Sequence, residues 1–206
     1  MSNSEIPRPD ENVLPEAERE DCKHIAWLLG LLNSYRERFE AAIALIIDSN
    51  KKIDALPSKL RSEWHDIGMR DAVMSVYHFQ YIFDGILKST HGCPTLMKKI
   101  DLAKLHTAQP LFKKHFPKTE GIRHAVAHAG ETQHSRKRLE EARYDGPLQI
   151  GGITLKGIAG GYVIHGWTMH MTHENKLVSM ELSPTKNEEL KSVVDAVFEA
   201  FRAVQP

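Results

Sequence analysis

The sequence predicts a mainly α-helical protein: a bundle of four to five helices with a small antiparallel β-sheet inserted before the last helix. Up to Gly130, apolar residues recur at three- and four-residue steps, which is the period of a helix with one buried face. From Pro147, glycines punctuate short β-like runs instead, a pattern typical of strands and turns. A last amphipathic stretch follows Ser183, and 206 residues suit one ordinary domain.

Two long helices are expected first, over residues 17–49 and 59–89. The polar residues 48–50 end the first helix, and Pro57 prevents an easy restart before the second. Ser58 follows at once and is a suitable N-cap, because its hydroxyl can accept a bond from a free backbone N–H. The sequence therefore predicts two long helices joined by a short polar connection.

Shorter helices are expected between residues 95 and 130. A third helix over 95–107 should be interrupted at Pro110, since a proline inside a helix removes a backbone donor and clashes with the preceding turn. Pro117 then opens a segment in which residues 122–129 continue as helix until Gly130.

The β insertion is predicted over about 147–183. Its middle run, 162–171, alternates in polarity and predicts one buried strand face. The residues of that face are Val163, His165, Trp167, Met169 and Met171. A turn at 173–175 leads to the last run, after which Ser183-Pro184 should cap a final helix that ends near Val204.

Composition and charge exclude several classes of protein. Residues 1–16 are acidic and proline-containing, which predicts a flexible tail ahead of a domain over 17–206. Lys and Arg balance Asp and Glu at 27 each, so no global basic field indicates nucleic-acid binding. No apolar run approaches the length of a membrane span, so no membrane association is expected. Only Cys22 and Cys93 are present, which excludes a Cys-rich zinc module and favours a reducing cytoplasm.

Histidine is unusually frequent, with 12 residues, and four of them fall between His115 and His134. The segment 121–131, which reads GIRHAVAHAGE, combines Arg123, His124 and His128. Histidine transfers protons near neutral pH, and arginine grips phosphate bidentately. These residue types are suited to phosphodiester chemistry.

At this segment the chain resembles a domain of the HEPN superfamily, a helical bundle in which many members carry an Arg-x4–6-His motif. Arg123 and His128 match the motif, and His124 stands where a polar residue often follows the arginine. The resemblance covers roughly residues 18–204, and the β insertion departs from the simplest members. It implies a homodimer whose two motifs face a shared cleft. It also implies metal-independent RNA cleavage, without a cofactor, in the nuclease members.

The resemblance gives each residue of the motif a role. His128 is the expected acid or base, Arg123 the phosphate clamp and His124 a supporting polar group, with a 2′,3′-cyclic phosphate as the product. On an ideal helix, however, positions five apart are separated by about 140° around the axis. Arg123 must then reach around the helix, or the two residues must meet across a dimer axis.

Two alternatives stay open at this stage. The spacing of His124 and His128 on one helix face also suits a metal site, with His134 as a third ligand. The other alternative is a non-catalytic helical module of the same family that binds a protein such as an antitoxin, a nucleotide or a nucleic acid. In that case the histidines only hydrogen-bond within a groove.

A basic stretch near the motif is the expected contact for an RNA backbone. Residues 112–143 hold eight Lys or Arg and four Glu. Within them, Arg136, Lys137 and Arg138 are the first candidates for phosphate contacts if the nuclease hypothesis holds. The competing interpretation is an ordinary solvated helix face.

Overall fold

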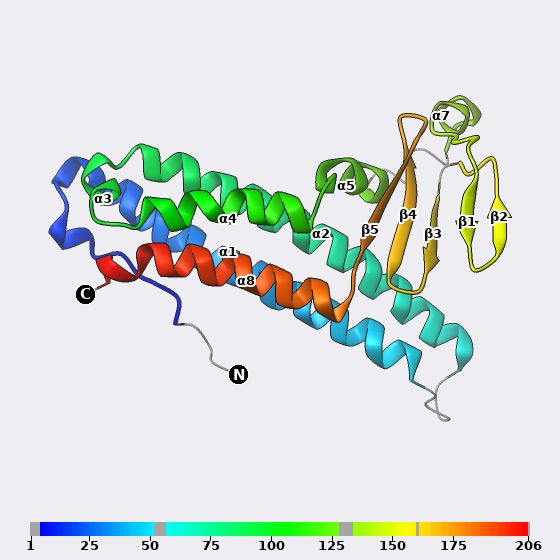
Figure 1. The fold of residues 1–206 in the computed structure, drawn as a ribbon, viewed down its shortest axis with the longest axis horizontal. Coiled ribbons are helices and arrows are strands. Elements are labelled where there is room, and N and C mark those ends of the chain that lie inside the picture. The colour runs from blue at the N-terminus through cyan, green and yellow to red at the C-terminus, as the bar shows by residue number, and fades with distance from the viewer. Residues whose placement is uncertain (1–4, 52–56, 128–133, 160, 206) are drawn as a thin grey trace.

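Two long antiparallel helices, α1 (Glu16–Asn50) and α2 (Ser58–His91), form the axis of the molecule in the computed structural model (Figure 1). The structure describes residues 5–51, 57–127, 134–159 and 161–205. Both helices agree with the predicted ranges to within two residues, although Pro57 and not Ser58 is the residue that precedes the second helix. Gly68 lets the pair approach closely, because a Cβ there would lie 2.8 Å from Ile46 Cγ1.

Helices α4 (Leu102–His115) and α8 (Pro184–Phe201) pack together and complete a four-helix core with α1 and α2. Stacked aromatic rings fill its centre, with Phe79 and Phe112 at 5.4 Å and Phe112 and Phe116 at 5.3 Å between ring centroids. A single helical turn, α3 (Pro94–Met97), leads into α4, and a 3₁₀ turn, η2 (Arg202–Val204), follows α8. The predicted start of the last helix is confirmed, because Ser183 Oγ accepts from Lys186 N.

The expected interruption at Pro110 is wrong, because α4 runs through this residue to His115. The predicted third helix is instead broken earlier, where Asp101 caps the start of α4 and accepts from Lys104 N. Pro110 is exposed, whereas Leu105, Ala108 and Phe112 are buried. Packing of that apolar stripe against α8 therefore outweighs the one lost backbone bond.

The acidic N-terminal segment packs on the bundle from residue 5 onward. Its short turn η1 (Glu11–Val13) is followed by the buried Leu14, and Pro7 and Pro9 are buried as well. Asp10 N donates to Val204 O at 2.9 Å, which joins the segment to the C-terminal turn. Residues 1–4 lie outside the described residues, so the mobility of the tail stays a prediction.

The β insertion forms two small antiparallel sheets, which agrees with the predicted fold class. Strands β1 (Leu148–Ile150) and β2 (Ile153–Leu155) pair with each other. Strands β3 (Tyr162–His165), β4 (Thr168–His173) and β5 (Lys176–Glu181) form the larger sheet in sequence order. The predicted turn before β5 is confirmed at Glu174 and Asn175, which both have positive φ.

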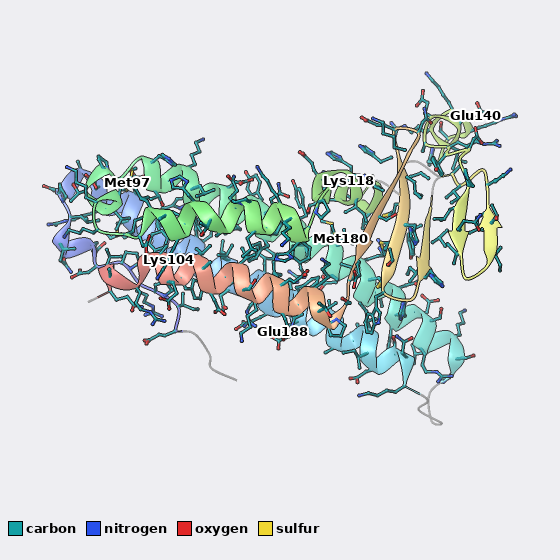
Figure 2. All side chains as sticks on the ribbon, viewed as in Figure 1. Met97, Lys104, Lys118, Glu140, Met180 and Glu188 are labelled. Carbon is teal, nitrogen blue, oxygen red and sulfur yellow. The ribbon has the colours of Figure 1, made fainter. Side chains whose placement is uncertain are left out.

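The predicted buried face of the middle run is wrong in its first half. A two-residue turn at Gly166 and Trp167, with Gly166 at φ 55°, separates β3 from β4. Ile164 therefore pairs with Met169, and residues directly opposite each other share a sheet face. His165 is exposed and is not a core residue. Met169, Met171 and Met180 are buried on the side that packs toward the helices. Figure 2 labels Met180.

Two short helices lie beside the larger sheet: α5 (Thr119–Ala127) and α7 (Arg136–Glu141). α5 contacts α2 as well as β4 and β5, so it sits between the bundle and the sheet. Cys22 and Cys93 are both free and buried. Within the described residues, none of the helices has the length and apolar character that a membrane span requires.

Candidate functional site

The motif helix α5 lies antiparallel along the middle of α2. Arg123 contacts Tyr77, whereas Val126 and Ala127, one turn later, lie beside residues 67–74 of α2. The two helices therefore run in opposite directions. On its other side, a Cβ built on Gly121 would be 3.5 Å from Val178 Cγ1 of β5. α5 is therefore held from two sides, by the bundle and by the sheet.

Arg123 is half-buried, and its guanidinium lies over the ring of Tyr77, with Cζ 4.8 Å from the ring centroid. Its Nη1 is 3.4 Å from His124 Nδ1. Its Nε is buried and has no hydrogen-bond partner among the described residues. An aromatic face attracts a cation but does not neutralise its charge. Arg123 is therefore fixed in place, and one of its buried donors has no partner among the described residues.

His124 is half-buried and stacks on His173 of β4, with the ring centroids 5.5 Å apart and the planes 7° from parallel. The sheet thus contacts the motif helix through one of the motif residues. Two parallel stacked imidazoles direct their ring nitrogens outward in their own planes, which does not suit shared coordination of one ion. The stack favours a positioning role for this pair over a ligand role.

The third motif residue, His128, lies outside the described residues, as do residues 129–133. The predicted pairing of Arg123 with His128 therefore stays a prediction. His134 is exposed. In the parts of the chain that the structure describes, no group of three His, Cys, Asp or Glu residues is arranged to hold a metal ion.

A groove of about 440 Å³ runs between α2 and the C-terminal end of α5. It is lined by Ile67, Arg70, Asp71, Met74, Val126 and Ala127. Its lining combines one cation, one carboxylate and apolar side chains, and Ile67 is 55% exposed. Arg123 is one helical turn from Val126, and Tyr77 is one turn from Met74, so the contact between Arg123 and Tyr77 lies in line with the groove.

His78 of α2 was not singled out from the sequence as a site residue. His78 stacks on Tyr35 of α1 at 5.1 Å and meets the edge of Tyr77 at 5.3 Å. Burial, followed by the charges of Arg38 and Arg123, lowers the pKa of His78 below its ordinary value. The weak sequence signal is that Tyr77-His78 interrupts the apolar pattern of the second long helix.

The predicted RNA contacts lie on α7, at the outer end of the sheet region (Figure 2 labels Glu140 there). Arg136 Nε is 3.0 Å from Glu140 Oε1, and Lys137 Nζ is 3.8 Å from Glu141 Oε1. Both cations are largely exposed, so these pairs are weak. Acidic residues of the same helix offset part of the charge of Arg136, Lys137 and Arg138, which favours the solvated-face interpretation.

Comparisons with protein-family models, with curated proteins and with solved structures found no match for this chain.

Proposed function

We propose that this chain is a HEPN-like, metal-independent endoribonuclease in which Arg123 holds the phosphate. The observation that carries the proposal is the environment of Arg123, whose guanidinium rests on Tyr77 with a buried Nε that no described residue satisfies. A buried donor without a partner is costly, so such a group in a native protein needs an explanation. A phosphate oxygen is a chemically suitable acceptor for it.

The chemistry follows from the residue types. The ribose 2′-OH loses its proton to a histidine, and its oxygen attacks the adjacent phosphorus. The bond to the 5′-oxygen breaks, and this oxygen takes up a proton as it leaves. Arg123 offsets the charge that develops on the phosphate oxygens, and His128 supplies one of the two proton transfers. The products are a 2′,3′-cyclic phosphate and a 5′-hydroxyl.

The proposal extends to assembly and location. A homodimer, as the resemblance implies, would bring two copies of the motif to one cleft. A reducing cytoplasm suits the two buried free thiols, Cys22 and Cys93. A toxin–antitoxin, defence or RNA-processing role would add a protein partner that controls the activity. Arg136, Lys137 and Arg138 remain secondary candidates for contacts with the RNA backbone.

The test is cleavage of end-labelled RNA in excess EDTA by the purified protein. We expect cleavage to persist and to leave cyclic-phosphate ends. Arg123→Ala and His128→Ala should each lose about 100-fold or more in rate, as removal of a charge-stabilising donor or a proton-transfer group usually does. Arg123→Lys tests the planar guanidinium, since a lysine keeps the charge but cannot bind bidentately.

Arg202→Ala is the matched control, because Arg202 is exposed and pairs with Glu199 on α8 and not with the motif helix. It should cleave like the wild type. RNA binding without cleavage would indicate the non-catalytic module instead. Activity that EDTA abolishes and zinc restores would indicate the metal site.

A further inference from the structure

His78 lies at a junction of three helices, next to the Arg123 clamp. Its ring is packed against Tyr35 of α1 and Tyr77 of α2, and Tyr77 in turn carries the guanidinium of Arg123 from α5. Arg38 follows Tyr35 by three residues on α1, so both occupy one helix face. His78 is therefore approached by a guanidinium from α1 and by another from α5.

The charges around this junction do not balance. Tyr35 from α1 and Tyr77 from α2 contact the ring of His78, and the charges of Arg38 from α1 and Arg123 from α5 act on it. Asp71 is two turns before His78 on α2 and lies 3.5 Å from Arg38, between Nη2 and Oδ1. Among the described residues, this carboxylate thus pairs with one of the two guanidinium groups that act on His78. An anion bound at the junction would restore the balance.

His78 itself is suited to accept a proton there. Burial and the two guanidinium groups lower its pKa below the ordinary value of 6.5, so the neutral imidazole predominates at pH 7. No described residue forms a hydrogen bond to its ring nitrogens, and its neighbours contact it through their rings. A lone pair on this ring is therefore left for a ligand.

We propose that Arg38 and Arg123 bind a phosphodiester against His78, and that His78 accepts the 2′-hydroxyl proton during RNA cleavage. The second half of this inference rests on the proposed function. The 2′-oxygen forms the new bond to phosphorus, the bond to the 5′-oxygen breaks, and the leaving oxygen takes up a proton from solvent. His78 thus takes the proton from the nucleophile, and the two arginines hold the phosphate between them.

The phosphate site is tested by a pH titration of the histidine Cε1–H signals in NMR spectra, with and without inorganic phosphate. The His78→Gln variant identifies which signal belongs to His78. Phosphate should raise the pKa of His78, because a bound anion favours the imidazolium. Arg38→Gln should raise this pKa in the absence of phosphate, since one cation is removed, and should weaken the response to phosphate. Arg202→Gln is the control. An unchanged His78 titration in millimolar phosphate would overturn the site.

The proton transfer is tested by the pH dependence of cleavage. The rate should rise with pH through the pKa of His78, which lies below 6.5. Arg38→Gln should move this acid limb to higher pH, a shift that a merely structural role would not produce. His78→Gln, checked by its melting curve, should lose about 100-fold in rate together with the acid limb.

The two proposals fail in different ways. Wild-type protein that never cleaves RNA would overturn the proposed function and the proton transfer, while the NMR titration still decides whether phosphate binds. Efficient cleavage with an unchanged rate and acid limb in His78→Gln would leave the proposed function standing and overturn the role of His78. Binding of phosphate in Arg38→Gln as tight as in the wild type would remove Arg38 from the site.

Discussion

At the scale of single residues, Arg123 differs from other arginines of the described chain in what its guanidinium contacts. Arg36 pairs with Glu37 and Glu40, Arg143 with Asp145, and Arg202 with Glu199. Arg123 rests on the ring of Tyr77 instead. A carboxylate partner would occupy the donors of the guanidinium and cancel its charge, whereas a ring does neither. The aromatic support of Arg123 is therefore compatible with anion binding.

This contact predicts unequal effects at Tyr77. Tyr77→Phe keeps the ring and should stay within about twofold of wild-type RNA cleavage, while Tyr77→Leu removes the ring and should lose roughly 2–30-fold, the equivalent of a cation–π contact of about 0.5–2 kcal/mol. Rates and melting temperatures of both variants check this. If the two variants had equal rates while both were folded, the ring would not position Arg123.

The residue-level site could be predicted from the sequence only in part. Arg123 and His124 were found because they are neighbours in one motif, and the structure brings them together. Tyr35, Arg38 and His78 were missed, because they come from two other helices and no spacing rule links residue 38 to residue 123. Contacts between helices depend on how the helices rotate about their axes, which one sequence does not specify.

At the scale of elements, the β4–β5 hairpin supports the motif helix. His173 stacks on His124, and Gly121 faces Val178. Two or three short strands are not stable alone in water, so the sheet and α5 depend on each other. The role of this insertion could not be predicted, because its contact with the motif helix joins residues far apart in the sequence, such as His124 and His173.

The observed register predicts the cost of substitutions in this sheet. Met169→Ala should lower the free energy of unfolding by about 2–5 kcal/mol, because Met169 is fully buried and leaves a cavity. His165→Ala should stay within about 0.5 kcal/mol, because His165 is exposed at the turn. Urea unfolding measures both. Similar losses for the two variants would favour the register in which His165 and Met169 share one buried face.

Sequence patterns predicted the long elements well and the breaks between them less well. The apolar period located α1, α2 and α8 to within a few residues, since each buries a continuous stripe. At Pro110 the local rule failed because burial of Leu105 and Phe112 overrides it. The predicted alternation of buried and exposed residues continues through Gly166, where the chain instead makes a two-residue turn. The turn changes which residues of β3 and β4 share a sheet face.

At the scale of the whole molecule, three histidines couple folding to pH. Burial is the first cause that lowers the pKa values of His65, His78 and His170 below 6.5. Unfolded chains then bind more protons than folded ones at pH values just below 6.5, so folding stability rises with pH in this window. Above pH 6.5 these three histidines leave the free energy of unfolding unchanged. Below pH 6.5 they lower it by more as the pH falls.

We therefore expect a lower free energy of unfolding at pH 5.5 than at pH 7.5 in urea titrations. The triple variant His65→Gln, His78→Gln, His170→Gln should show a smaller difference between the two pH values. His134→Gln serves as the control, because His134 is exposed, and should keep the wild-type difference. A triple variant with an undiminished difference would assign the pH dependence to other groups.

The position of α8 in the core sets the time at which the site forms during protein synthesis. A ribosome makes α1 and α2 first, with Arg38 and His78, but α1 and α4 both pack on α8, which is made after the sheet. Elongation proceeds at about 5–20 residues per second, and domains fold as units. A nascent chain that lacks residues 162–201 has neither the hairpin that supports α5 nor a closed core. We therefore expect the proposed RNA cleavage to be absent from nascent chains until α8 has been made.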